Sequence, residues 1–223
     1  MNIASYIDHT VLKPTTTNDD IKKVCEEAIQ FRFAAVCVPP PMVRKAKTLL
    51  QDSGVKTATV IGFPFGYSIA RAKLAEAQQA IQDGADELDV VINLVALKNN
   101  AWSYLEQEME DIVELCHKNE RLVKVIIESG VLTDEEIIKC CNIYANLKVD
   151  YVKTSTGYAE KGATIEAVKL MRANLPSEIK IKASGGIRNY EFAKQLVDAG
   201  ADRLGCSASV AIVKGETGDA GYY

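Results

Sequence analysis

The chain has 223 residues, of which 48% are hydrophobic and 25% are charged, and its formal net charge at pH 7 is -4. This composition is ordinary for a globular protein and allows one large domain or two small ones. The acidic balance gives no reason to expect a nucleic acid or an anionic membrane surface as a partner, and no apolar run reaches the length of a membrane span.

Cysteine and histidine usage narrows the class of protein further. The six cysteines form no C-x-x-C pair, and most of them fall on apolar positions of expected helices or strands. This pattern is typical of reduced thiols in a cytoplasmic protein. The N-terminus has no basic region followed by an apolar core, so we expect no secretory signal. With only His9 and His117 as histidines, we expect no zinc site and no cofactor.

Eight apolar and β-branched segments alternate with segments whose apolar residues recur at helical spacing. The expected strands are residues 5–12, 33–38, 55–63, 86–93, 122–128, 151–155, a segment starting at 180, and 202–206, the first being short and weak. The expected helices begin near residues 17, 42, 68, 102, 133, 164, 189 and 209. The sequence marks two helix starts clearly, because acidic residues follow Thr17 and a capping box joins Thr133 to Glu136.

A recurring junction suggests how these units are arranged. Gly84-Ala-Asp86 recurs as Gly200-Ala-Asp202, and each joins a helix end to a strand start. A repeating strand–helix unit over this length predicts the α/β class and a single (β/α)8 TIM barrel spanning residues 1–223. A Gly-rich segment from about residue 215 to residue 223 is expected to form a flexible tail. A doubly wound open sheet is the alternative, but that fold seldom needs eight similar strands.

Three charged residues occupy strands that should be buried on both faces. Lys153 lies in the middle of the strand 151–155, Lys182 lies in the next strand, and Asp89 lies among apolar residues of the strand 86–93. Lysine is among the residue types least often buried. Because side chains alternate along a strand, Lys153 and Tyr151 share a face, which we expect to point into the barrel. Catalytic groups of such barrels sit at the carboxyl ends of the strands, where these residues fall.

Two interpretations of this group remain open. It is either an ion-pair network that holds the barrel interior together or the site of an amine nucleophile. Two lysines and one carboxylate leave the group positively biased, so one lysine can lose its proton. Lowering a lysine pKa from about 10.4 to about 7 costs the ammonium form about 4–5 kcal/mol. Burial and a second ammonium act in that direction, which is how a Schiff-base lysine arises.

The turns after the last two expected strands predict a phosphate site. Gly185 and Gly186 follow one strand and precede a helix, and Gly205 and Ser207 lie in the other strand-to-helix junction. Barrels often bind phosphate at these two loops through backbone N–H groups and helix N-termini. Arg188 could add a charged contact.

Three other residues are weaker candidates. His9 is more simply a hydrogen-bonded interior histidine than a ligand. Cys37 has no evident histidine beside it, so we expect it in the core rather than as a nucleophile. Lys124 could join the interior polar network or pair with Asp89.

At these residues the chain resembles the deoxyribose-phosphate aldolase family over essentially its whole length. The resemblance runs through Ile7-Asp-His-Thr-Val-Leu12, Val36-Cys-Val38, Glu87-Leu-Asp-Val-Val-Ile-Asn93, Lys124-Val-Ile-Ile-Glu128, Val152-Lys-Thr-Ser-Thr-Gly157 and Lys182-Ala-Ser-Gly-Gly-Ile-Arg188. The Lys-Thr-Ser-Thr-Gly segment followed later by Lys-x-x-Gly-Gly is a highly specific pair.

The resemblance implies a metal-free class I aldolase that reversibly cleaves 2-deoxy-D-ribose 5-phosphate to D-glyceraldehyde 3-phosphate and acetaldehyde in deoxynucleotide catabolism. It implies that Lys153 forms the Schiff base, that Lys182 lowers its pKa, and that Asp89 takes part in proton transfer through water. The expected partners are these phosphosugar and aldehyde substrates and further copies of the chain in a dimer or larger homo-oligomer.

The same resemblance implies several binding residues. The phosphate would lie on Gly157, Gly185, Gly186, Arg188, Gly205 and Ser207. Asp8 and Thr10 would contact the sugar hydroxyls. Tyr223 matches in type a C-terminal tyrosine that helps move the enamine proton in the family, and Lys124 is a second candidate for a proton relay.

One position departs from the family pattern. Some members carry a lysine directly after Ser-Thr-Gly, where it contacts the phosphate, but this chain has Tyr158. We therefore expect weaker phosphate binding or a substitute contact from Lys161.

Two rival functions fit the same sequence features. A phosphosugar isomerase or epimerase on the same barrel would use a carboxylate or cysteine base, often with a metal. A non-catalytic binding protein would hold the sugar phosphate and turn nothing over.

Overall fold

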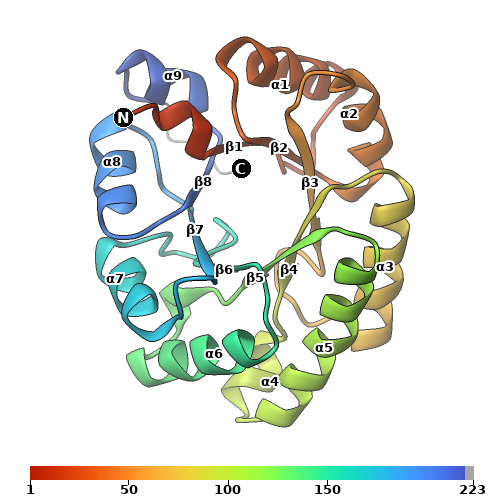
Figure 1. Ribbon diagram of the computed structural model, residues 1–223, viewed down its shortest axis with the longest axis vertical. Helices are drawn as coiled ribbons and strands as arrows, with labels where there is room; N and C mark the ends of the chain where they lie inside the picture. The colour runs from red at the N-terminus through yellow and green to blue at the C-terminus, as the bar shows by residue number, and fades with distance from the viewer. Residues whose placement is uncertain (219–223) are drawn as a thin grey trace.

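The computed structural model describes residues 1–218 and shows eight parallel strands that close into a barrel (Figure 1). Each strand pairs with the next along the chain, and β8 pairs with β1. The strands are β1 (Ile7–Thr10), β2 (Ala35–Val38), β3 (Lys56–Ile61), β4 (Glu87–Val91), β5 (Leu122–Ile126), β6 (Tyr151–Lys153), β7 (Lys180–Ser184) and β8 (Arg203–Cys206). The predicted (β/α)8 barrel is confirmed, and the open sheet considered as its alternative is wrong.

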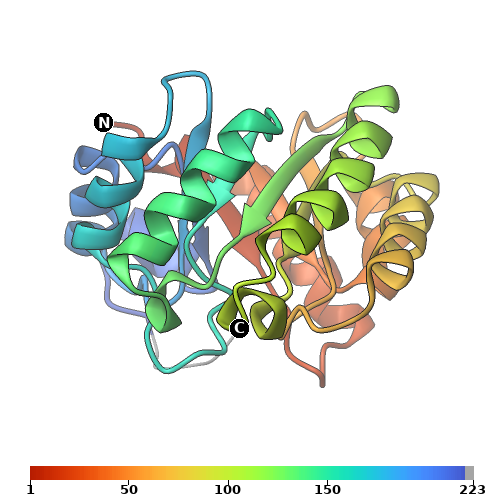
Figure 2. The same cartoon turned by 90° about the horizontal axis from the view of Figure 1, so that it is seen from below.

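Helices form a ring outside the strands (Figures 1 and 2). They are α1 (Asn18–Phe31), α2 (Val43–Leu49), α3 (Ala70–Gln82), α4 (Leu94–Lys98), α5 (Trp102–Lys118), α6 (Asp134–Asn146), α7 (Ile165–Asn174), α8 (Tyr190–Asp198) and α9 (Ser209–Lys214). Three short 3-10 turns, η1 (Ile3–Tyr6), η2 (Pro40–Met42) and η3 (Ser129–Val131), complete the regular structure of the described residues. The short helix α4 was not expected from the sequence.

Side-chain caps explain why several helices begin where they do. Thr17 and Thr133 each form a complete capping box with the acidic residue three positions later. Thr164 and Asn189 accept hydrogen bonds from the third backbone N–H of α7 and α8. Each cap satisfies a backbone donor that would otherwise lack a partner at the helix start.

The alternation of side chains divides each strand between two environments. One face, which includes Val36, Val90 and Val152, packs against the ring of helices in the main hydrophobic core. The opposite face points into the barrel. On β2 and β3 the inward residues are small and apolar, whereas on β4 to β8 they are mostly charged. The barrel interior therefore has an apolar side and a charged side.

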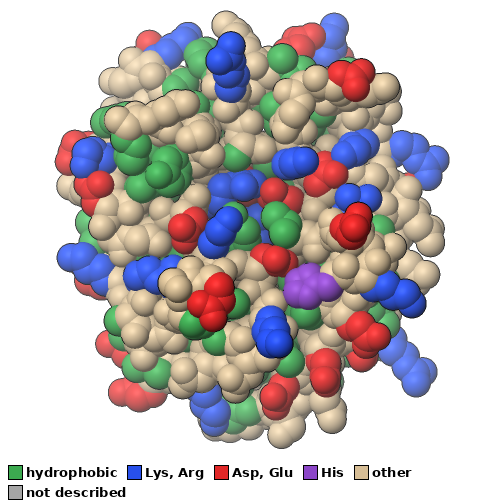
Figure 3. Space-filling view, viewed as in Figure 1, with side chains coloured by type: hydrophobic (Ala, Val, Ile, Leu, Met, Phe, Trp, Pro, Cys, Tyr) green, Lys and Arg blue, Asp and Glu red, His purple; other side chains and the backbone are tan. Residues whose placement is uncertain are grey.

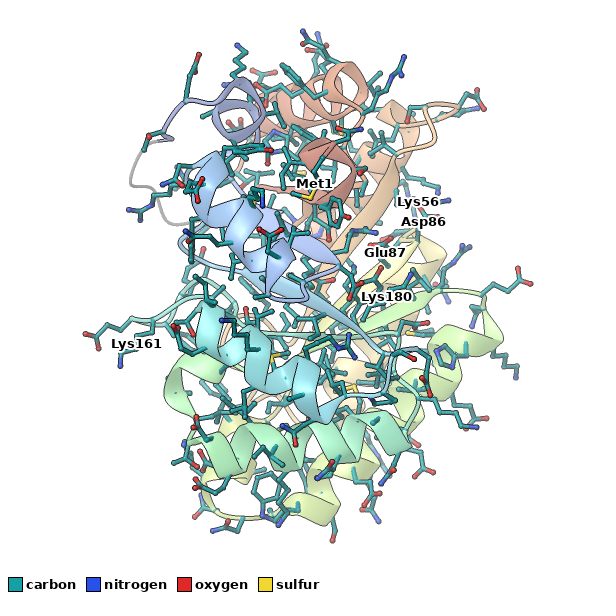
Figure 4. The ribbon with its side chains drawn as sticks, turned by 60° about the vertical axis from the view of Figure 1, so that its left-hand side comes forward. Met1, Lys56, Asp86, Glu87, Lys161 and Lys180 are labelled. Carbon is teal, nitrogen blue, oxygen red and sulfur yellow. The ribbon has the colours of Figure 1, made fainter. Side chains whose placement is uncertain are left out.

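The two ends of the barrel differ in what they expose. Figure 4 shows Glu87 and Lys180, the first residues of β4 and β7, at the same end of the barrel as Met1. Figure 3 looks onto this N-terminal face, where Lys, Arg, Asp and Glu side chains gather at the centre. The strands run from this face toward the opposite one, and Lys153 is the last residue of β6.

The described part of the expected tail is held by backbone hydrogen bonds. Gly215 closes α9 in a left-handed conformation, and the N–H of Glu216 donates to the Ala211 carbonyl at 2.8 Å. The N–H of Gly218 donates to the Arg188 carbonyl, also at 2.8 Å. Tyr223 lies outside the described residues, so its expected part in proton transfer stays a prediction.

Candidate active site

The three residues singled out on interior strands meet at one carboxylate oxygen. Lys153 and Lys182 are paired residues on the neighbouring strands β6 and β7. The Nζ of Lys153 donates to Asp89 Oδ2 at 2.8 Å, and the Nζ of Lys182 donates to the same oxygen at 2.7 Å. All three side chains are at most 4% exposed. The three residues predicted from the sequence to form one group are therefore in direct contact in the fold.

The charged group is larger than the sequence indicated. Lys124 donates to Asp89 Oδ1 at 2.7 Å and lies 2.7 Å from Glu87 Oε2. Arg203 donates to Glu87 at 2.8 Å. We call the whole set the interior charge network, and its members are Asp8, Glu87, Asp89, Lys124, Lys153, Lys182 and Arg203. It holds four cationic side chains and three carboxylates.

Glu87 and Arg203 were missed by the sequence reasoning, although Glu87 carried a signal. Glu87 precedes Asp89 by two positions on one strand and must share its face. Arg203 opens the last strand, a position that usually lies at the surface. The expectation that Lys124 could pair with Asp89 is confirmed.

The pKa values of the three lysines in the interior charge network shift in different directions. Burial alone would lower the pKa of Lys182, but the adjacent Asp8 and Asp89 outweigh it and hold that pKa well above its ordinary value. Burial lowers the pKa of Lys153 below its ordinary value, with Lys182 adding to the effect and Asp89 opposing it. The pKa of Lys124 is raised, because Asp89 and Glu87 outweigh its burial. Of the three lysines, Lys153 is therefore the one that most readily becomes a neutral amine.

Two carboxylates of the interior charge network, Asp8 and Asp89, have lowered pKa values. Burial would raise the pKa of Asp89, but Lys124, Lys153 and Lys182 outweigh it and hold that pKa well below its ordinary value. Arg203 and Lys182 likewise keep the pKa of Asp8 low against its burial. Both side chains thus remain charged at neutral pH.

An apolar wall faces the charged side of the barrel. It consists of Leu12, Ala35, Cys37, Ala58 and Val60, with Phe63 and Tyr158 packed against it. The Tyr158 hydroxyl donates to the Leu12 carbonyl at 2.9 Å, and its ring meets Phe63 edge-on with centroids 5.4 Å apart. Tyr158 therefore joins the loops that follow β1, β3 and β6.

Two residues judged more simply structural have packing partners that suit that role. His9 points away from the barrel interior, and its Nε2 lies 2.7 Å from Glu27 of α1. Cys37 is fully buried, and burial raises the pKa of its thiol to about 11. A thiol with that pKa is a poor nucleophile at neutral pH.

Glu128 fixes the loop that follows Lys153, a role the sequence reasoning did not foresee. Its backbone is left-handed, with φ 55° and ψ 56°, and only 3% of the residue is exposed. Its carboxylate accepts hydrogen bonds from the N–H of Thr156 at 3.2 Å and from the Thr156 hydroxyl at 2.5 Å. Burial raises the pKa of Glu128 above its ordinary value. The loop is thus tied to the end of β5.

The glycine-rich loops after β6 and β7 come into close contact. A Cβ added at Gly185 would lie 3.0 Å from the Gly162 Cα and 3.3 Å from the Gly157 Cα. Gly157, Gly185 and Gly186 all have positive φ, at 91°, 88° and 79°. Such conformations turn successive backbone N–H groups toward one side, which forms an anion-binding concavity. A side chain at Gly185 would therefore have to push the backbone of the neighbouring loop aside and would also be strained by the positive φ.

The remaining residues expected to bind phosphate lie on the neighbouring loop and strand. Arg188 follows the Gly185-Gly186 turn and is exposed, and Ser207 follows β8 and is exposed. Gly205 lies within β8 and pairs with Asp8 of β1 and Ser184 of β7. Lys161, the suggested substitute for a missing lysine, is exposed and projects away from the barrel (Figure 4).

Asp8 and Thr10 are buried in the barrel wall rather than open to solvent. Asp8 accepts from Lys182 at 2.5 Å and from Arg203 at 2.7 Å. The Thr10 hydroxyl donates to the backbone carbonyl of Asp8 at 2.9 Å. In this structure Asp8 holds two cations of the interior charge network, and its expected contact with a sugar hydroxyl stays a prediction.

Residues 1–218 were expected to contain neither a metal site nor a membrane span. No group of three or more His, Cys, Asp or Glu side chains in this range is arranged to hold a metal ion. None of its helices combines the length and the apolar character needed to cross a membrane.

A closed parallel barrel that buries a lysine of lowered pKa beside a carboxylate has the features that Schiff-base chemistry needs. The family model for DeoC/LacD family aldolases matches residues 2–215. The chain belongs to this aldolase family.

Relatives and a solved structure agree with this assignment. The chain is 50% identical over 217 residues to a deoxyribose-phosphate aldolase of Thermococcus gammatolerans, covering 96% of each protein. It is 47% identical over 222 residues to deoxyribose-phosphate aldolase 1 of Oceanobacillus iheyensis, covering 100% of each. The tetrameric deoxyribose phosphate aldolase from Aeropyrum pernix superposes with a TM-score of 0.89 and 35% identity, over 95% of this chain and 89% of that one.

Proposed function

We propose that the chain is a class I aldolase that reversibly cleaves 2-deoxy-D-ribose 5-phosphate to D-glyceraldehyde 3-phosphate and acetaldehyde. The observation that carries this proposal is the contact of Lys153 and Lys182 with one oxygen of Asp89 in a fully buried setting. A barrel lysine with a lowered pKa beside a charged carboxylate has what carbinolamine formation and proton transfer both need. Family membership supports the same reaction.

Lys153 is the proposed nucleophile. Its neutral amine attacks the aldehyde carbon of the open-chain sugar, and loss of water from the carbinolamine gives an iminium ion. The iminium withdraws electrons from the C2–C3 bond of the substrate. Cleavage releases glyceraldehyde 3-phosphate and leaves an enamine, which is protonated and hydrolysed to acetaldehyde.

Asp89 and Lys182 are proposed to manage protons and charge around this step. Asp89 accepts the proton of the substrate C3 hydroxyl through a water molecule. Lys182 stays an ammonium ion, since Asp8 and Asp89 stabilise its charge, and it disfavours a second ammonium at Lys153. Lys124 holds the other oxygen of Asp89 and is a candidate for relaying its proton. Tyr223 is proposed to assist protonation of the enamine.

The phosphate is proposed to bind where the glycine-rich loops meet. The positive φ angles of Gly157, Gly185 and Gly186 and the contact between their loops support this placement. Arg188 and Ser207 would add a charge and a hydroxyl from the adjoining loops, with Gly205 keeping β8 close behind them. Asp8 and Thr10 are proposed to lie nearest the sugar hydroxyls.

The test is borohydride trapping with acetaldehyde, followed by mass spectrometry of the intact protein and its peptides. We expect a two-carbon adduct on the Lys153 peptide and none in Lys153→Ala. An adduct on Lys182 instead would exchange the roles of the two lysines. No adduct in a protein that still turns over sugar phosphate would refute the Schiff-base mechanism.

A phosphosugar isomerase or epimerase would behave differently in a second test. Its activity would survive Lys153→Arg and would fall with a metal chelator. The aldolase proposed here loses activity in Lys153→Arg and keeps it with chelator. A protein that binds the sugar phosphate without any turnover would be the non-catalytic alternative.

We further propose that residues 1–223 act as one catalytic domain in the cytoplasm and assemble as a homo-oligomer. Six free, buried cysteines suit a reducing compartment. Phe65, Tyr67 and Ile69, on the loop between β3 and α3, are each more than half exposed and offer apolar surface to another subunit. Light scattering after gel filtration tests the assembly, and a monomer at micromolar concentration would refute it.

A further inference from the structure

The interior charge network continues from Lys153 through the barrel to its N-terminal face. Asp89 accepts a hydrogen bond from Lys124, and the Lys124 Nζ also lies 2.7 Å from Glu87 Oε2. Glu87 in turn accepts from Arg203 at 2.8 Å, and Arg203 also donates to Asp8 at 2.7 Å. Because Asp8 accepts from Lys182, the contacts close into a ring. The far side of this ring is the Glu87–Arg203 pair.

The Glu87–Arg203 pair lies closer to the N-terminal face of the barrel than the reacting amine. Glu87 is the first residue of β4 and Arg203 the first of β8, whereas Lys153 is the last residue of β6. Figure 4 shows Glu87 beside the N-terminal face, and Figure 3 shows charged side chains at the centre of that face. The Arg203 side chain is 12% exposed there. Neither residue contacts Lys153 directly in the hydrogen bonds of the described chain.

The charges of the interior charge network do not cancel. With every member ionised, four cations face three carboxylates, so the network carries one positive charge in excess. A neutral Lys153 removes that excess. Besides the seven network members, the titratable groups near Lys153 are Cys37, Glu128, Tyr151 and Tyr158.

We propose that Glu87 and Arg203 act as positioning residues that set, from the N-terminal side of the barrel interior, the pH range in which Lys153 is a neutral amine. The proposal rests on Lys153 being the Schiff-base lysine of the proposed function. It assigns a part in the reaction to two residues that touch neither substrate nor nucleophile.

The sign of each effect follows from the charge balance. Removing the Glu87 carboxylate leaves two positive charges in excess and disfavours the ammonium form of Lys153. Removing the Arg203 guanidinium leaves no excess and favours that form. Glu87 lies about 6.6 Å along β4 from Asp89, the carboxylate that Lys153 contacts. A unit charge about 10 Å from Lys153 shifts its pKa by about one unit at an effective dielectric constant of about 20.

The experiment is the pH dependence of acetaldehyde trapping by borohydride in Glu87→Gln and Arg203→Gln. The rate rises as Lys153 loses its proton, so the midpoint of this rise reports on that amine. We expect the midpoint to move about one unit to lower pH in Glu87→Gln and about one unit to higher pH in Arg203→Gln. Glu87→Asp and Arg203→Lys keep the charges and serve as matched controls.

Opposite shifts in the two neutral variants, with controls close to the wild-type midpoint, support the proposal. Shifts of the same sign, no shift, or equal shifts in the controls overturn it, because a merely structural role changes packing in all four variants. If Arg203→Gln does not fold by circular dichroism, the near-isosteric Glu87→Gln decides by its shift or the lack of one. A wild-type protein that acetaldehyde and borohydride do not label at Lys153 refutes the proposed function instead.

Discussion

Replacing Lys182 by leucine should raise the pKa of Lys153 and slow the enzyme at neutral pH. The two ammonium groups share Asp89 Oδ2, at 2.7 Å and 2.8 Å. Their nitrogens therefore lie about 5 Å apart, where two unit charges repel by about 3 kcal/mol at an effective dielectric constant of about 20. Removing one charge should raise the pKa of the other lysine by about two units.

The variant should remain folded because its remaining charges balance. Asp8 still forms its ion pair with Arg203, and Asp89 still forms its ion pairs with Lys124 and Lys153. Three cations then face three carboxylates, and leucine fills the space of the lost side chain without leaving a buried unpaired charge. Thermal denaturation followed by circular dichroism checks this expectation.

The assay is the rate of cleavage of 2-deoxyribose 5-phosphate as a function of pH. A rise of two units in the pKa of Lys153 predicts roughly a hundredfold loss of rate below that pKa. The loss should shrink as the pH rises and the amine becomes neutral in both proteins, which makes the alkaline end an internal control. A folded variant whose pH profile keeps the wild-type midpoint would refute the electrostatic reasoning.

Three further predictions concern the surroundings of Lys153. Asp89→Asn leaves buried cations without a carboxylate and should lower the free energy of unfolding by about 3–5 kcal/mol in urea titrations; a loss below about 1 kcal/mol would contradict the network. Because burial raises the pKa of Glu128, its ionisation costs stability, and this cost grows as the pH rises from the unfolded pKa through the folded pKa. Glu128→Gln should therefore raise the melting temperature at about pH 8 and not at about pH 3, below the unfolded pKa. An equal gain at both pH values would remove ionisation as the cause. Tyr158→Lys should lower the KM for the phosphorylated substrate severalfold while costing about 1 kcal/mol for the lost bond to Leu12, and an unchanged KM would place the phosphate elsewhere.

The barrel and the central residues of its site could be predicted because they follow from patterns within short stretches of the sequence. Alternation along β6 placed Lys153 and Tyr151 inside, and the same rule placed Asp89 inside from β4. Helix caps at Thr17 and Thr133 were legible because the acid three residues later completes a capping box. Each of these features depends on neighbours within a few positions of the chain.

The missed features depend on geometry that a local pattern does not contain. Whether Arg203 of β8 reaches Glu87 of β4 depends on the shear and diameter of the closed barrel, which bring distant strands across its interior. The left-handed backbone of Glu128 is unusual for a residue with a side chain and gives no compositional cue. The helix α4 has only five residues, too few for a helical period to emerge from the sequence.

Because the barrel interior has an apolar side and a charged side, substitutions can change its shape without changing its charge. Ala58 and Val60 of β3 lie on the apolar wall, and the hydrogen bonds and ion pairs of the interior charge network involve neither. Substitutions among these small residues change the volume and shape of the barrel interior opposite the charged side while leaving the charges of the interior charge network unchanged. We therefore expect substitutions on the apolar wall to alter aldehyde preference while the proposed nucleophile on the opposite wall is retained.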